Sequence, residues 1–160
     1  MVLFFHGREG SPTGSKATWL ARTRGAVTPQ LDTRTVEGAL PLARAALEAH
    51  APSLVVGSSF GGALAVALLQ EGRIRVPVVL LAPAAHKLGV PNVLPEGARV
   101  VILHGDQDDV VPLDDSVALA RTGGPAVSLR VIPGGDHRLE GLLRDGTLDE
   151  VLTALGCPAS

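Results

Sequence analysis

The sequence is short of several residue types, and each shortage excludes a class of protein. Its single cysteine, Cys157, excludes a disulfide framework within the chain. Neither sign of charge is in excess, since 14 basic and 16 acidic residues are interspersed and give a net charge of −2. This balance argues against a nucleic-acid or membrane surface. No apolar run is long enough to span a bilayer. No basic region precedes the short apolar run at the N-terminus, so we expect no signal peptide and a cytoplasmic protein.

The chain does contain enough apolar sequence for a sizeable core. With 160 residues, of which 46% are hydrophobic and 19% charged, residues 1–160 are expected to form one globular domain. Short continuous apolar runs, typical of buried parallel strands, recur along the sequence. Strands are expected at residues 2–5, 54–56, 77–82, 99–103 and 127–132, with a weaker one at 26–32. Pro29 interrupts the weaker strand and favours a place at the edge of the sheet.

Helices are expected between these strands. They are predicted from residue 15 to a stop at Gly25, through 42–49, over 63–70 and 113–121, and from Thr147 to a stop at Gly156. Pro41 is tolerable in the first turn of the second helix. Thr147 and Glu150 have the spacing of a capping box. Alternation of strands and helices predicts an α/β fold, a three-layer sandwich with a mostly or wholly parallel sheet of about six strands.

The most informative segment lies between the strand at 54–56 and the helix that follows it. It contains Gly57-x-Ser59-x-Gly61, the arrangement called a nucleophile elbow. An abrupt turn here lifts the serine hydroxyl clear of the backbone and strains the φ and ψ of the serine. The chain also passes so close to itself that side chains two residues away on either side would collide, which explains the glycines. The pattern therefore predicts either an activated Ser59 or an idle serine in a glycine-rich strand-to-helix turn.

Other chemistry-bearing residues follow the ends of the neighbouring strands. In parallel sheets of this kind, ligands bind beyond the carboxyl ends of the strands. The first strand leads into His6-Gly7-Arg8, and the strand at 99–103 leads into a carboxylate-rich turn at 104–109. The last strand leads into Asp136-His137. A serine, a carboxylate and a histidine are therefore expected to meet at one edge of the sheet.

With these segments the sequence resembles the α/β-hydrolase family, in the family's order of serine, acid and histidine. The segments are His6-Gly7, Gly57-x-Ser59-x-Gly61, His104-Gly-x-x-Asp108-x-x-Val111-Pro112 and Gly135-Asp-His137. The chain looks closest to small, cap-less members similar to carboxylesterases and thioesterases. By comparison with full-length members it starts at the third strand and lacks the two leading strands. Residues 83–97, with three prolines, leave little room for the helix that usually follows the sixth strand.

The resemblance implies a serine hydrolase with Ser59 as nucleophile, His137 as base and Asp108 as acid. A serine hydroxyl needs a base within hydrogen-bond reach, and an imidazole can take its proton and pass it to the leaving group. The acid would fix the tautomer of the imidazole. The resemblance also implies an oxyanion hole formed by the backbone N–H groups of Arg8 and Phe60. No cofactor is implied.

Several assignments have alternatives. Asp106 and Asp109 flank Asp108, and either could supply the acid, although the spacing from His104 favours Asp108. Asp106 and Asp136 are expected to be turn carboxylates, with Asp106 bonding its own loop. His104 and His6 are expected to anchor loops at the strand ends rather than act as bases. The histidines lack ligand spacing and the cysteine is alone, so no metal site is predicted.

Two features of the sequence suggest other functions. The segment Gly10 to Ala17 has the look of a phosphate-binding loop, but Ser15 and Ala17 stand where that loop needs a glycine and a serine or threonine. A nucleotide-binding protein is therefore not favoured. The second rival is a hydrolase fold used as a protein-binding module with little turnover. The sequence does not distinguish it from an enzyme.

The expected substrate is a small ester or thioester. With three phenylalanines, one tryptophan and no segment long enough for a lid, the sequence predicts an open, shallow site. Such a site suits short acyl esters or thioesters, or an ester on a larger molecule. Arg8, Lys16, His86 and Lys87 are expected near its mouth, where they would either favour an anionic substrate or form a solvated rim. Peptidase and lactonase activities stay open at this level, as does the oligomeric state.

Overall fold

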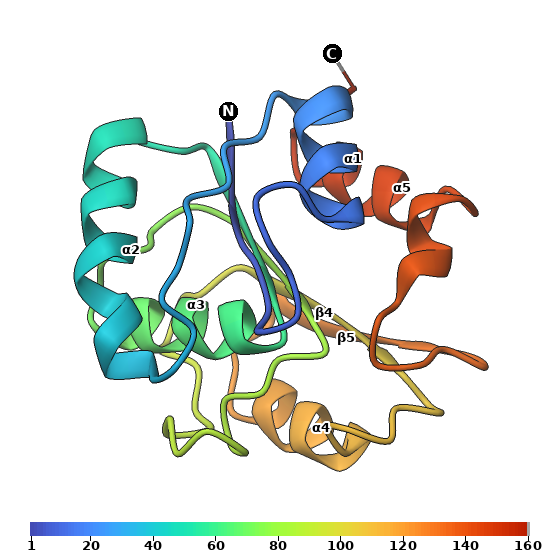
Figure 1. The fold of residues 1–160 in the computed structure, drawn as a ribbon. Coiled ribbons are helices and arrows are strands. Elements are labelled where there is room, and N and C mark those ends of the chain that lie inside the picture. Colours follow the sequence, from blue (N-terminus) through green and yellow to red (C-terminus); the bar gives the residue numbers. More distant parts are fainter. Residues whose placement is uncertain (160) are drawn as a thin grey trace.

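The apolar runs form a parallel sheet with helices on both faces (Figure 1). The computed structural model describes residues 1–159, and over that range it contains five strands in the order β1-β2-β3-β4-β5, every neighbouring pair parallel. They are β1 (Val2–Phe5), β2 (Leu54–Ser58), β3 (Val78–Leu81), β4 (Val100–Gly105) and β5 (Val127–Ile132). The first four are almost wholly buried, as continuous apolar strands in a covered parallel sheet should be. The predicted α/β sandwich is confirmed.

Residues 26–32 lie where the weak strand was expected, but they do not form a strand. They run beside β1 at the sheet edge and pair with it in a single parallel bridge, Leu3 to Val27. Two backbone hydrogen bonds make this bridge, from Phe4 N to Val27 O and from Val27 N to Val2 O. Pro29 cannot donate a hydrogen bond, so the pairing does not continue. The sheet therefore has five strands where about six were expected.

Helices cover both faces of the sheet. Within residues 1–159 they are α1 (Ser15–Arg24), α2 (Val36–His50), α3 (Phe60–Gln70), α4 (Leu113–Arg121), α5 (Thr147–Ala154) and a short 3₁₀ helix, η1 (Glu140–Leu143). One core cluster joins α2, α3 and α4 to one face, and a second joins α1, η1 and α5 to the other. Figure 1 shows the same division, with the sheet between the two groups.

Two helix starts differ from the prediction. Helix α2 begins at Val36, after the side chain of Thr35 accepts a hydrogen bond from Gly38 N, so Pro41 lies inside the helix and not in its first turn. Helix α5 has Gly146 as its N-cap, and Thr147 is already its first helical residue. Thr147 therefore forms no capping box. The carboxylate of Asp145 accepts from the Thr147 amide instead. The helix ends at Gly25 and Gly156 are confirmed, both with positive φ.

The carboxyl ends of all five strands open toward the loops that contain the predicted site residues. These loops are 6–14 after β1, the β2–α3 turn, 82–99 after β3, 106–112 after β4 and 133–139 after β5. Residues 82–99 contain no helix, as their prolines predicted. No helix within residues 1–159 combines the length and apolar character needed to cross a membrane.

Candidate active site

Ser59 occupies the sharp turn between β2 and α3. Its φ of 52° and ψ of −109° lie outside the regions that a serine ordinarily adopts. A Cβ atom on Gly57 would lie 2.6 Å from the carbonyl oxygen of Gly61, and one on Gly61 would lie 1.9 Å from that of Phe5. Both glycines are therefore required by close backbone approach. The turn leaves the Ser59 side chain at the carboxyl edge of the sheet, in a hollow of the surface.

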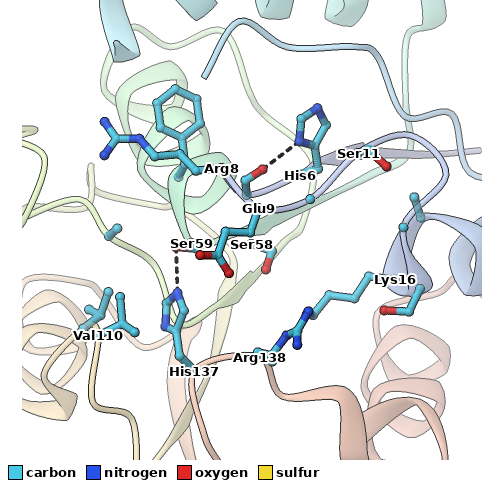
Figure 2. A pocket seen from close by; sticks show the side chains of 18 of the residues that line it. His6, Arg8, Glu9, Ser11, Lys16, Ser58, Ser59, Val110, His137 and Arg138 are labelled. Carbon is cyan, nitrogen blue, oxygen red and sulfur yellow. Dashed lines mark hydrogen bonds between the residues drawn. The ribbon is translucent and has the colours of Figure 1, made fainter. Parts of the chain in front are cut away.

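His137 joins Ser59 to Asp108, although the three residues come from separate loops. The Nε2 atom of His137 lies 2.9 Å from Ser59 Oγ (Figure 2). Its Nδ1 atom lies 2.8 Å from Asp108 Oδ2. A carboxylate only accepts hydrogen bonds, so Nδ1 carries the proton and donates it to Asp108. Nε2 is then free to accept from the serine hydroxyl. The structure thus brings the three predicted residues together in one hydrogen-bonded chain.

The carboxylate of Asp108 is completely buried and held by its own loop. Its Oδ1 atom accepts from the backbone N–H groups of Val110 and Val111, at 2.9 and 2.8 Å. Burial alone would raise the pKa of Asp108. The hydrogen bonds from Val111, His137 and Val110 outweigh burial and hold that pKa below its ordinary value. Asp108 is therefore charged over the whole neutral range and can stabilise a positive charge on His137.

His104 lies behind Asp108 and does not reach Ser59. Its ring is completely buried, and Nε2 donates to the carbonyl oxygen of Val111 at 2.9 Å, while Asp108 Oδ2 lies 3.2 Å from the same nitrogen. Nδ1 is hydrogen-bonded to the hydroxyl of Ser116 on α4, at 2.7 Å. These bonds anchor the 106–112 loop between β4 and α4. They give His104 the loop-anchoring position that the sequence predicted.

His6 anchors the turn after β1 in the same way. Its Nδ1 donates to the carbonyl oxygen of Gly7 at 2.8 Å, and its Nε2 accepts from the amide of Leu31 at 3.2 Å. Gly7 and Arg8 line the hollow beside Ser59 and Phe60. Within residues 1–159, the amide N–H groups of Arg8 and Phe60 have no protein acceptor. Two residues that line the hollow beside Ser59 therefore have backbone N–H groups without a protein acceptor.

The remaining predicted residues have other positions. Asp106 accepts from Gly134 N at 2.7 Å and so ties its loop to the one after β5, not to itself. Asp136 accepts from Leu139 N, as a turn carboxylate should. Asp109 is exposed. Over residues 1–159 no three His, Cys, Asp or Glu side chains come together as metal ligands could.

The hollow around Ser59 has a volume of about 310 Å³ and is open on one side. Of the four cations expected at its mouth, Arg8, Lys16 and Lys87 line it, whereas His86 does not. Glu9, Arg138 and Glu140 also line it, and they were not among the residues predicted from the sequence. Arg138 could have been predicted to lie near the site, since it directly follows His137 in the sequence.

The protein resembles known proteins in its structure, and its sequence matches no family model and no curated protein. Among solved structures it resembles a protein of the alpha/beta superfamily of hydrolases from Xanthomonas campestris pv. campestris, with 22% identity, a TM-score of 0.79 and 96% of each chain covered. It also resembles mouse alpha/beta hydrolase domain-containing protein 10, with 18% identity, a TM-score of 0.77, and 96% of this chain and 90% of that one covered.

A third similar structure is Est1E from Butyrivibrio proteoclasticus. It shares 18% identity with this chain and has a TM-score of 0.73, with 96% of this chain and 84% of that one covered. Each likeness extends over nearly the whole of the present chain, so it includes the sheet and the loops that surround Ser59. Together with the parallel sheet and the strand-to-helix turn at Ser59, these likenesses show that the chain has the α/β-hydrolase fold.

Proposed function

We propose that this protein is a serine hydrolase that acts on small carboxylic esters or thioesters through a Ser-His-Asp triad. The observation that carries the proposal is the 2.9 Å contact between His137 Nε2 and Ser59 Oγ, with the second ring nitrogen bonded to a buried carboxylate. An imidazole in this tautomer can remove the hydroxyl proton as the serine attacks a carbonyl carbon. Solved structures of similar fold include the esterase domain of a Rhodothermus marinus protein.

The reaction proceeds in two halves. Ser59 Oγ attacks the carbonyl carbon while His137 takes the proton, and His137 then gives that proton to the leaving alcohol or thiol. The acyl group remains on Ser59. A water molecule, deprotonated by His137, attacks this acyl-enzyme and releases the acid and the free serine. Asp108 keeps the imidazole oriented and stabilises its positive form in both halves.

The negative charge on the carbonyl oxygen would be stabilised by the backbone N–H groups of Arg8 and Phe60. Neither amide has a protein acceptor within residues 1–159, so both can donate without breaking another bond. The Phe60 amide also lies at the N-terminus of α3, where the helix dipole favours negative charge. One such donor is typically worth a factor of about 10²–10³ in rate.

The size of the hollow supports a small substrate with a short acyl group. Its volume is about 310 Å³, near the lower limit for small-molecule sites. Est1E has been solved with ferulic acid bound, which shows a small carboxylic acid in a protein of this fold. With a series of para-nitrophenyl esters of increasing acyl length, we expect kcat/KM to be highest for short acyl chains. A preference for long chains would contradict this size limit.

The activity can be tested with an active-site fluorophosphonate probe. We expect the probe to label the protein, and labelling to disappear in Ser59→Ala. Ser59→Ala and His137→Ala should each lower kcat for a short ester by about 10⁴–10⁶-fold while the fold is retained, as measured by circular dichroism. Ser128→Ala, which removes an exposed serine on β5, should label like the wild type. No labelling of correctly folded protein would favour the alternative, a hydrolase fold that serves as a binding module.

The other sequence-based expectations stay predictions. These are a single domain over residues 1–160, a cytoplasmic location, a reaction without cofactor, and no nucleic-acid partner. The proposed substrate is a small molecule, and the proposed chemistry needs only Ser59, His137, Asp108 and the two backbone amides.

A further inference from the structure

Two cationic side chains lie side by side in the hollow that contains Ser59. Lys16 comes from the first turn of α1, and Arg138 directly follows His137 in the loop after β5. Figure 2 shows the two side chains extending toward each other, on the side of the hollow away from Val110. Their charges are close enough that Arg138 affects the ionisation of Lys16. The pair therefore forms a positively charged wall of the proposed active site.

These two cations differ from the other two in the hollow. The guanidinium of Arg8 donates to the carbonyl oxygens of Thr33 and Arg34, and the ammonium of Lys87 donates to that of Val110. Among residues 1–159, neither side chain, of Lys16 or of Arg138, donates a hydrogen bond, and neither has a carboxylate oxygen within 4.0 Å. Arg8 and Lys87 thus hold loops in place, whereas Lys16 and Arg138 have their donors available to a ligand.

The nearby carboxylates do not neutralise the pair by direct contact. Glu140 accepts a hydrogen bond from the hydroxyl of Ser15, at 3.0 Å, and Asp136 accepts from Leu139 N. Burial lowers the pKa of Lys16 and is the largest influence on it. The charge of Arg138 also lowers this pKa, whereas the charges of Glu140 and Asp136 raise it, and the net result is a lowering. The ammonium is thus partly desolvated beside a like charge. The attraction of an anion placed between the two cations would offset both the desolvation and the repulsion.

We propose that Lys16 and Arg138 form a subsite for an anionic group, such as a carboxylate, carried by the ester or thioester substrate. This inference rests on the proposed function, since it places the anion in the hollow of Ser59. The substrate class becomes short esters with a charged group on either the acyl or the alcohol portion. The charge would be bound on the wall formed by α1 and the loop after β5, while the carbonyl group faces Ser59.

Matched ester pairs test the subsite. On the acyl side, the mono-para-nitrophenyl ester of glutaric acid is compared with para-nitrophenyl pentanoate, which has a methyl group in place of the carboxylate. On the alcohol side, para-carboxyphenyl acetate is compared with para-carbamoylphenyl acetate. We expect the anionic member to have the higher kcat/KM in at least one pair, and that pair identifies the portion of the substrate that the subsite binds. The absence of any preference in both pairs would overturn the inference.

Variants assign the preference to the two cations. Lys16→Gln and Arg138→Gln should each lower the ratio of anionic to neutral kcat/KM by about fivefold, as expected for loss of a partly exposed charge contact. Glu140→Gln should raise that ratio, since it removes a competing carboxylate. Arg22→Gln removes an exposed cation from the same helix, outside this hollow, and should leave the ratio unchanged. A ratio that does not respond to Lys16→Gln or Arg138→Gln would also overturn the inference.

Binding to the Ser59→Ala variant separates this inference from the proposed function. Glutarate should shift the amide NMR signals of residues around Lys16 and Arg138, and the neutral diamide of glutaric acid should not. These shifts should disappear when Lys16→Gln is added to Ser59→Ala. If the wild type hydrolyses no ester and yet shows these shifts, the subsite stands and the hydrolase proposal fails. If esters are hydrolysed but glutarate causes no such shifts, the subsite is wrong and the hydrolase proposal stands.

Discussion

Asp108 orients His137 and also contributes to the stability of the protein in acid. Its buried carboxylate accepts from two backbone amides and from His137, and its pKa is held below the ordinary value. The folded state therefore binds the Asp108 proton less readily than the unfolded state does. The stability that this group contributes is fully present above its unfolded pKa, about 3.9. It is lost as the pH falls through the lower, folded value.

We therefore expect Asp108→Asn to change two measurements. The value of kcat should fall by about 10⁴-fold, because an amide does not fix the required tautomer or stabilise the imidazolium. The free energy of unfolding, measured with urea, should decline less steeply below about pH 4 than in the wild type. The comparison is made between pH 3 and pH 7, with Asp109→Asn as a control that alters an exposed neighbour. Parallel pH curves for Asp108→Asn and the wild type would contradict the assignment of Asp108.

His104 acts on the same carboxylate from behind, so its removal should affect stability more than chemistry. His104→Phe keeps an aromatic ring, although a larger one, and leaves the Val111 carbonyl and the Ser116 hydroxyl without their partner. We expect a loss of about 1–3 kcal/mol in the free energy of unfolding. The value of kcat should fall far less than in His137→Ala. Loss of kcat as large as in His137→Ala, in a variant of normal stability, would make His104 the base instead.

At the scale of elements, the backbone segments around the β2–α3 turn lie so close together that a Cβ atom at Gly57 or Gly61 would overlap backbone atoms. A Cβ on Gly61 would lie 1.9 Å from the carbonyl oxygen of Phe5 in β1, so the strand and the helix must separate. We expect Gly61→Ala to lower the free energy of unfolding by about 3 kcal/mol or more, or to prevent folding. Gly124→Ala, where an added Cβ meets nothing within 4 Å, should change it by less than about 1 kcal/mol. Thermal denaturation of both variants tests this difference.

The elements that the sequence predicted well are those with local causes. The strand-to-helix turn was predictable because Gly57 and Gly61 meet their neighbours within the turn itself or at the adjacent strand. Gly25 and Gly156 likewise mark helix ends through their own positive φ. Prediction was poorer where several local signals compete. Helix α2 continues through Pro41 because Thr35 caps it earlier and its apolar face packs on α3, and tertiary packing outweighs the lost hydrogen bond.

Tertiary arrangement also decides which charged groups meet. That Ser59, Asp108 and His137 lie at one edge of the sheet followed from strand order and direction, which a pattern of alternating elements reveals. The proximity of Lys16 and Arg138 did not follow, since it depends on how α1 packs beside the loop after β5. The same holds for the edge segment at 26–32. Its position beside β1 was predictable, but its single bridge depends on the path of the chain between α1 and α2.

At the scale of the whole molecule, one buried cation joins α1 to α5 on the face of the sheet that they share. The side chain of Arg24 in α1 is completely buried, and it donates to the carboxylate and the carbonyl oxygen of Asp149 in α5. Its guanidinium carbon lies 5.7 Å from the centre of the Trp19 ring. Its Nε is a buried side-chain nitrogen with no acceptor among residues 1–159. The Asp149 carboxylate therefore compensates the charge of the buried Arg24 guanidinium.

Removing the Asp149 carboxylate should therefore lower the free energy of unfolding by more than a surface ion pair normally contributes to it. We expect Asp149→Ala to lower the free energy of unfolding by about 1–3 kcal/mol, because Arg24 stays buried with a lost charged acceptor. Glu150→Ala is the matched control, since Glu150 also lies in the first turn of α5 but pairs with the exposed Arg130. That change should cost about 0–1 kcal/mol. Urea denaturation of the two variants compares them directly. Equal losses would mean that Asp149 acts only through the helix dipole, and that Arg24 does not hold α1 against α5.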